Sequence, residues 1–217
     1  MKRKFTTIVA GLWLAAIAGA SQVPASTLAF IPLAPSLDRA SGKVLLTLDE
    51  ALELAFPKLE VTRSTEFLSK EQVERVKRLS GYPAISRIVY PYKATRLDPE
   101  TGEEVLVGTA YFETHRVRSL KETMMFVVSP EGVLTRAEVL AFYEPSDYMP
   151  NERFYAQFRG KRLNDDLRPN RGIKTVTGCT LTVNASTSAA RRILAIHQIL
   201  GESKPEPEEG DAEGSQE

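Results

Sequence analysis

The sequence predicts an α+β domain in which helices cover one side of a twisted antiparallel sheet. Three observations predict this class. Two capping-box motifs open helices early in the chain, a series of extended segments with hairpin-type turns follows, and helical patterns return near the carboxyl end. This order of elements is typical of a sheet whose strands are neighbours in sequence.

The first elements lie between residues 43 and 57. Lys43–Leu46 predicts a short strand, and Thr47 with Glu50 three residues later forms a capping box. We expect the helix to run through Phe56 and to end at Pro57, because proline cannot continue a helix.

A second capping box, Ser69 with Gln72, opens a helix to about Leu79, and Gly81 ends it. The apolar period then changes from helical to extended, and turn residues separate the extended segments, which predicts an antiparallel meander. The four predicted strands are Ile85–Arg96, Val105–Val117, Thr123–Ser129 and Val133–Tyr143.

Two more helices follow the predicted sheet. Asn151 caps a helix over Glu152–Phe158, and a polar loop follows over Lys161–Gly172. The last helix is expected to begin at Asn184 or Ser186. Its apolar face is formed by residues spaced four, three and four apart: Ala189, Ile193, Ile196 and Leu200.

The ends of the chain differ in composition from this domain. Residues 1–20 have three bases followed by a short apolar run ending in Ala-Gly-Ala, which predicts a secretory signal peptide; an uncleaved membrane anchor is the alternative. Residues 21–42 are predicted to be a linker. Residues 202–217 contain seven acids and one base and predict a disordered tail. We therefore expect a domain at 43–201 that lies outside the cytoplasmic membrane.

Composition excludes several functional classes. The 217 residues include 28 basic and 28 acidic residues, one cysteine and two histidines. The absence of a basic excess argues against nucleic-acid binding. One cysteine cannot form an intramolecular disulfide, and with two histidines it cannot complete a structural zinc site. We predict no metal site and no catalytic residue set.

The segment Gly172–Ser188 is the most unusual in the chain. Seven of its seventeen residues carry a hydroxyl, and it leads into the last predicted helix. Free N–H groups and the helix dipole make such a helix start suitable for binding an anion. The alternative is a helix cap rich in serine and threonine that has no ligand.

Three stretches carry a family resemblance. Thr177–Thr180 (Thr-Gly-Cys-Thr) resembles the Ser/Thr-Gly-Ala-Thr motif of the FMN-binding domain family, found in subunits of the sodium-translocating NADH:quinone oxidoreductase and of the Rnf complex. Ala137–Pro145 and Arg153–Lys161 are similar to the family's strand with a Glu and its helix ending Gln-Phe-x-Gly-Lys. The resemblance covers about residues 104–200, and residues 47–118 look like the extension of secreted relatives.

The resemblance implies a cofactor, FMN, and a set of site residues. In the family, the last threonine of the motif, here Thr180, is esterified to the FMN phosphate by a magnesium-dependent flavin transferase that uses FAD. The other implied cofactor-binding residues are Thr177, Gly178, Cys179, Leu181, Thr182, Glu144, Lys161 and Lys174. Family members usually carry an acid where Lys174 stands and alanine where Cys179 stands.

The resemblance further implies that the chain is an electron carrier and not a complete enzyme. It would work outside the cytoplasmic membrane, with a membrane oxidoreductase or haem protein as its partner. Two alternatives remain: a cofactor-free module that has lost flavinylation, as Lys174 suggests, and a reductase binding FMN without a covalent bond. Tyr143, Tyr148 and Phe154 are weaker candidates for stacking on a ring, with a core position as the alternative. His115 and His197 are interpreted as packing or surface residues, not as ligands or bases.

Overall fold

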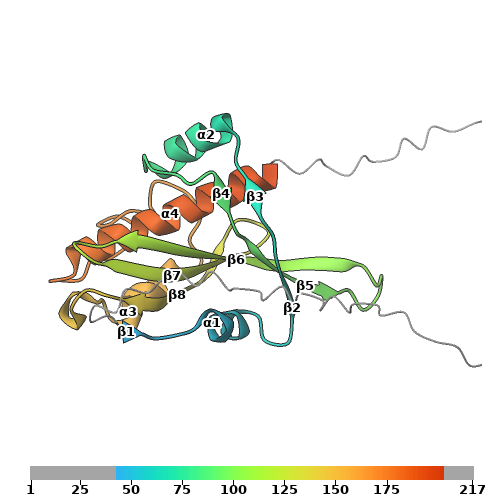
Figure 1. Cartoon of the computed structure of the whole chain (residues 1–217), viewed down its shortest axis with the longest axis horizontal. Coiled ribbons are helices and arrows are strands. Elements are labelled where there is room, and N and C mark those ends of the chain that lie inside the picture. Colours follow the sequence, from blue (N-terminus) through green and yellow to red (C-terminus); the bar gives the residue numbers. More distant parts are fainter. Residues whose placement is uncertain (1–42, 203–217) are drawn as a thin grey trace, which may run out of the picture. The chain divides into compact units, whose positions relative to one another are not determined.

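The computed structural model describes residues 43–202. The predicted signal peptide at 1–20, the linker at 21–42 and the predicted tail beyond Glu202 lie outside the described residues. Within the described part, the chain is an α+β domain with four α-helices and a six-stranded antiparallel sheet, which confirms the predicted class (Figure 1).

The sheet has the strand order β1-β8-β7-β6-β5-β2, and every neighbouring pair is antiparallel. The predicted meander is therefore confirmed in β5 to β8, which pair in sequence order. Bulges interrupt the register of β5 with β6 and of β7 with β8. In sheet order the strands are Lys43–Val44 (β1), Leu134–Phe142 (β8), Lys121–Val128 (β7), Glu104–Arg116 (β6), Tyr92–Leu97 (β5) and Glu60–Arg63 (β2).

The predicted strand Ile85–Arg96 is wrong in extent. It is divided into β4 (Ile88–Val89) and β5, with Pro91 between them, because proline has no N–H to donate to a ladder. Strand β4 pairs with β3 (Glu66–Phe67) in a separate two-stranded ribbon. Strands β2 and β3 were not predicted, since both are short and mostly exposed and show no apolar alternation.

Both predicted capping boxes are present. Helix α1 (Leu48–Ala55) begins after Thr47, and α2 (Lys70–Ser80) begins after Ser69; in each, the N3 side chain bonds back to the N-cap backbone. Gly81 ends α2 with a φ of 74°, the left-handed conformation that favours glycine. These local signals fixed the helix starts.

The predicted helix Glu152–Phe158 is shorter in α-form than expected. Helix α3 covers Glu152–Tyr155 and continues as a 3₁₀ turn, η2, over Ala156–Phe158. Asn151 has the extended backbone of an N-cap, but its side chain makes no capping bond. A second 3₁₀ turn, η1 (Ser146–Tyr148), follows β8.

Helix α4 (Thr180–Glu202) begins earlier than either predicted start, Asn184 or Ser186. Asparagine and serine both favour the cap position, but here they lie inside the helix. The hydroxyls of this segment bond to the preceding turn: Ser186 Oγ to Thr182 O at 2.8 Å and Thr187 Oγ1 to Val183 O at 2.7 Å. The predicted apolar face is confirmed, with three of its residues buried and Leu200 packed against them.

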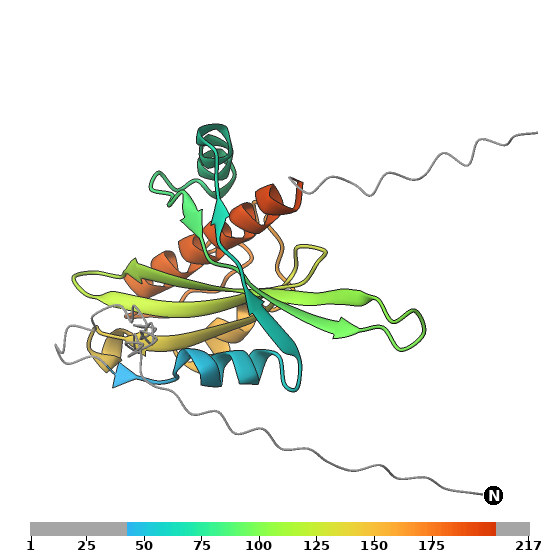
Figure 2. The same ribbon diagram turned by 45° about the vertical axis from the view of Figure 1, so that its right-hand side comes forward.

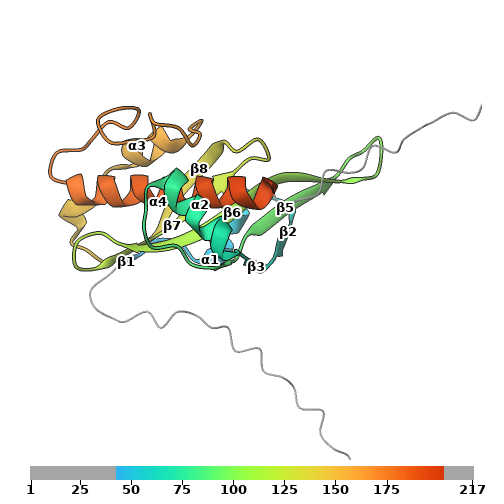
Figure 3. The same ribbon diagram turned by 90° about the horizontal axis from the view of Figure 1, so that it is seen from above.

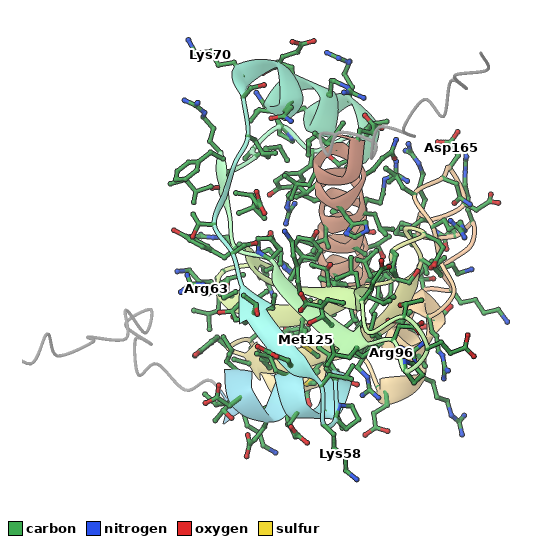
Figure 4. All side chains as sticks on the ribbon, turned by 90° about the vertical axis from the view of Figure 1, so that its right-hand side faces the viewer. Lys58, Arg63, Lys70, Arg96, Met125 and Asp165 are labelled. Carbon is green, nitrogen blue, oxygen red and sulfur yellow. The ribbon has the colours of Figure 1, made fainter. Side chains whose placement is uncertain are left out.

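The helices lie on both faces of the sheet, not on one side as predicted. Helix α4 crosses one face with α2 stacked on it, and α1 covers the other face (Figures 1 and 3). Viewed along α4, the labelled Met125 lies in the sheet between these layers, and Lys58 and Lys70 point outward at opposite ends (Figure 4). The hairpin of β5 and β6 extends beyond the helices (Figure 2).

Two apolar clusters correspond to these two faces. The larger lies beneath α4 and includes Phe126, Phe154, Phe158 and Leu194, all at most 2% exposed. The smaller lies beneath α1 and includes Met125, which is fully buried. The larger cluster fixes the first turn of α4 against the ends of β6 and β8, where the candidate site lies.

Candidate functional site

The first turn of α4 is formed by the hydroxyl-rich segment. Cys179 N–H donates to Val176 O at 3.1 Å, and Val183 N–H donates to Cys179 O at 2.9 Å, so the helix starts at Thr180. Gly178 precedes this turn with a φ of 84°, and a Cβ at that position would have no neighbour within 4 Å. The N–H groups of the first turn have no acceptor within the helix.

The 3₁₀ turn η1 holds this first turn in place. Thr182 Oγ1 donates to Tyr148 O at 2.6 Å, and Cys179 Sγ lies 3.7 Å from Asp147 O. Thr182 is fully buried and Cys179 is buried, whereas Thr180 and Leu181 are exposed. The four residues 179–182 thus divide into two buried positions and two surface positions.

Glu144 fixes the loop between β6 and β7. Its Oε1 accepts from the N–H groups of Leu120 and Ser119, each at 2.6 Å, and from Arg118 N–H at 3.2 Å. Burial alone raises the pKa of Glu144, but these donors outweigh it, and the pKa is lowered from its ordinary value. Glu144 is therefore not a solvated loop carboxylate: it is 6% exposed and positions the loop.

A cavity of about 120 Å³ lies between this loop and the first turn of α4. Six of the nine predicted site residues line it: Glu144, Gly178, Cys179, Thr180, Leu181 and Thr182. The remaining walls come from Val117, Arg118 and Tyr148. The structure thus brings together the motif and the glutamate that the sequence placed 36 residues earlier than Thr180.

Arg118 is a wall residue that was not predicted as part of the site. Its guanidinium lies 5.8 Å from the centre of the Tyr148 ring, and Nη1 lies 3.4 Å from the Tyr148 hydroxyl. It places a positive charge opposite the helix start, where an anion is favoured. A base in a hairpin turn has no local sequence pattern that marks it as functional, so tertiary structure was needed to find it.

Three predicted site residues lie outside the cavity lining. Lys161 O accepts from Leu134 N–H at 2.8 Å, at the start of β8, whereas Glu144 follows the end of that strand. The nine residues of β8 separate these ends by roughly 26 Å. Thr177 and Lys174 are exposed on the loop before α4, and Gln157 binds the Lys174 backbone at 2.8 and 3.1 Å.

The weaker candidates have separate roles. Tyr148 lines the cavity, whereas Phe154 is 1% exposed and packs on Tyr155 and Phe158 in the core. Tyr143 has a buried hydroxyl without a hydrogen bond to any described residue. His197 Nδ1 lies 2.9 Å from the Tyr111 hydroxyl, and burial lowers the pKa of His197.

His115 belongs to a buried polar cluster around Glu122. The carboxylate of Glu122 is fully buried and meets His115 Nε2 at 2.9 Å, the Tyr155 hydroxyl at 2.9 Å and Ser186 Oγ at 2.8 Å. The cluster joins β6, β7, α3 and α4. His115 is thus a buried hydrogen-bonding residue, in keeping with its interpretation as a packing residue.

Within residues 43–202, no group of three or more His, Cys, Asp and Glu residues is arranged to hold a metal ion. The same part of the chain contains no helix with the length and apolar character needed to cross a membrane. Comparison of the sequence and structure with protein-family models, with curated proteins and with solved structures finds no match.

Proposed function

We propose that the chain is an exported flavoprotein that carries FMN on the Thr180 hydroxyl and transfers electrons outside the cytoplasmic membrane. One observation carries the proposal: Thr180 is the first residue of α4, is exposed, and lies at a cavity that combines a helix N-terminus with Arg118. The Thr-Gly-Cys-Thr resemblance supplies the cofactor class.

The residues present fit the phosphodiester of such a cofactor. The helix N-terminus and Arg118 favour a single negative charge, and the N–H groups of the first turn are donors to its oxygens. Gly178 leaves the backbone open on this side, with no atom within 4 Å of the Cβ position. Lys174 lies on the same loop but does not line the cavity.

The cavity is too small to enclose the whole cofactor. Its 120 Å³ is below the roughly 300–1,000 Å³ of pockets that enclose drug-sized ligands. The exposed surface beside it is apolar and aromatic, since Leu181 is 50% and Tyr148 37% exposed. We infer that the cavity holds the phosphate end, and that these two side chains form the surface available to the flavin ring.

A bound flavin supplies the redox chemistry, and the protein holds it and limits access. The hydroxyl of Thr180 has no hydrogen-bonded base among the described residues, and Glu144, the carboxylate in the cavity wall, makes no hydrogen bond to it and accepts from loop donors at Oε1. A hydroxyl without such a base is a weak nucleophile at neutral pH. This supports attachment by an outside flavin transferase rather than by the chain itself.

The test is co-expression with a flavin transferase, followed by denaturing electrophoresis under ultraviolet light. The intact protein should give a fluorescent band, and Thr180→Ala should abolish it. Thr175→Ala is a matched control, because Thr175 is an exposed hydroxyl on the same loop outside the cavity. Lys174→Glu, which restores the family's usual charge, should label at least as strongly as the intact chain.

A dark band in the intact protein and in Lys174→Glu would contradict covalent attachment. A yellow native protein that loses its colour on denaturation would then indicate FMN held without a covalent bond. A colourless native protein would favour the second candidate function, a cofactor-free binding module, which the basic Lys174 at the family's acidic position supports.

A further inference from the structure

Two hollows lie between α4 and β6, beside the cavity at the first turn of α4, which we call the anchor cavity. Their volumes are about 550 and 230 Å³, and the larger is in the range of pockets that bind small molecules. Four residues line both hollows: Tyr82, His115, Arg116 and Arg192. We call these two hollows together the α4 groove.

Two consecutive arginines of α4 differ in how their donors are used. Arg191 donates to four backbone carbonyls, those of Leu79, Ser80, Asn164 and Leu167, at 2.6–3.4 Å. Arg192 donates from Nε and Nη2 to the Glu113 carboxylate. Its Nη1 is buried and has no partner among the described residues. Arg191 is a structural residue, whereas Arg192 retains a donor at the groove.

His115 has a second unpartnered atom at the same place. Its Nε2 faces Glu122, which also receives hydroxyl donors from Tyr155 and Ser186, so the network assigns the hydrogen to Nε2. Its Nδ1 is buried and has no hydrogen-bond partner in the described part of the chain. Nδ1 accepts a hydrogen bond when the ring is neutral and donates one when the ring is protonated.

The two unpartnered atoms lie on neighbouring side chains. Glu113 and His115 are two residues apart on β6 and share a face of the sheet, so their backbone positions are roughly 6–7 Å apart. Glu113 holds Arg192. A carboxyl group that bridges the two side chains takes one hydrogen bond of about 2.8 Å from each of them.

We propose that the α4 groove binds an organic carboxylate with an aromatic body. The carboxyl group accepts from Arg192 Nη1 and shares one proton with His115 Nδ1; no covalent bond forms or breaks. The walls suit the aromatic body, because the Arg192 guanidinium lies 4.1 Å from the centre of the Tyr82 ring. Four further tyrosine and phenylalanine rings line the larger hollow: Tyr90, Tyr92, Tyr111 and Phe112. Arg63 and Arg116 add positive charge to the lining.

The site is separate from the flavin anchor but adjacent to it, since Leu181 and Val117 line both the smaller hollow and the anchor cavity. Inorganic phosphate fits less well, because two donors leave most of its oxygens unpaired. A carboxylate bound here would lie near a flavin carried on Thr180. The proposal does not depend on that flavin.

The test is a titration of the full chain, labelled with ¹⁵N-histidine, with benzoate and with its neutral analogue benzamide. The chain has two histidines, so His115→Gln assigns the resonances. We expect saturable benzoate binding that shifts the His115 ring nitrogens, and binding of benzamide at least tenfold weaker. The binding measurement itself uses the intact protein, and only the assignment of the resonances depends on the variant.

Two variants and one control locate the site by calorimetry. His115→Gln keeps a donor toward Glu122 but lacks Nδ1. Arg192→Lys keeps a cation for Glu113 but lacks the guanidinium group that supplies Nη1. Each variant should raise the benzoate Kd at least tenfold. Arg136→Lys, in a half-buried pair with Glu138 that lies outside the groove lining, should leave the Kd unchanged. Thr180→Ala should bind benzoate normally, which separates this test from that of the flavin.

Absence of a saturable shift at His115 would overturn the proposal. Equal affinity for benzamide, displacement of benzoate by equimolar inorganic phosphate, or an unchanged Kd in both variants would do the same.

Discussion

The first turn and the middle of α4 belong to one helix but use their side chains differently. At the first turn, Thr180 and Leu181 are exposed, and the polar backbone groups are free for a ligand. In the middle, Arg191 and Arg192 are buried and bind residues that are far away in sequence. The end of the helix is thus available for chemistry, and its middle holds the domain together.

The two buried glutamates show the same contrast. Glu144, near the first turn, accepts mainly backbone N–H donors from one loop, so it shapes the wall of the cavity. Glu122, beneath the middle of α4, accepts side-chain donors from three other elements. Loss of Glu144 should therefore loosen one loop, whereas the residues around the middle of the helix affect the whole domain.

The largest expected effect is that of Arg191→Leu. This change leaves four carbonyls without their donor, two in buried and two in partly buried contacts, and should lower the free energy of unfolding by about 3–5 kcal/mol, measured by urea denaturation. Arg75→Leu is the control, because Arg75 pairs with Glu202 in an exposed position, and it should cost less than about 1 kcal/mol. If both variants lost the same free energy of unfolding, the middle of α4 would not hold the domain together through Arg191.

Glu144→Gln should have an intermediate effect, about 1–2 kcal/mol at neutral pH, because the amide keeps an acceptor but loses the charge. The pKa of Glu144 is lowered in the fold, so its stabilisation is full above about pH 4.5 and is lost as the pH falls toward the folded pKa. The difference in stability between the intact protein and the variant should therefore shrink in acid, as followed by urea melts at several pH values.

The exposed Glu152 provides the control for this effect. Glu152→Gln should change the free energy of unfolding little. The difference between this variant and the intact protein should not depend on pH in the way expected for Glu144→Gln. A pH-independent effect at Glu144 would mean that its charge does not hold the loop.

The smallest effect is expected at Thr180. Thr180→Ala should change the unfolding free energy by less than about 0.5 kcal/mol, because the side chain is exposed and makes no hydrogen bond within the described residues. Thr182→Ala, two residues later, removes a buried hydroxyl bonded at 2.6 Å and should cost about 1–3 kcal/mol. Thermal melts of the two variants compare the same substitution at a surface and a packing position.

Local patterns predicted much of the fold correctly. The capping boxes at Thr47 and Ser69 and the order of the four meander strands needed only neighbouring residues. The start of α4 was misplaced because serine and threonine favour caps when considered alone, yet here they bond within the helix or to η1. Strands β2 and β3 were missed because pairing with distant partners, not local alternation, makes them strands.

The sequence by itself determined the hydroxyl-rich helix start and its resemblance to a flavin-carrying motif, because these depend on consecutive residues. Only the tertiary structure decided that Glu144 and Arg118 join that helix start while Lys161 lies at the other end of β8. It alone placed His115 and Arg192 beside each other in the α4 groove. The physical reason is that sheet register and helix packing set contacts between residues far apart in the chain, and no local pattern encodes these contacts.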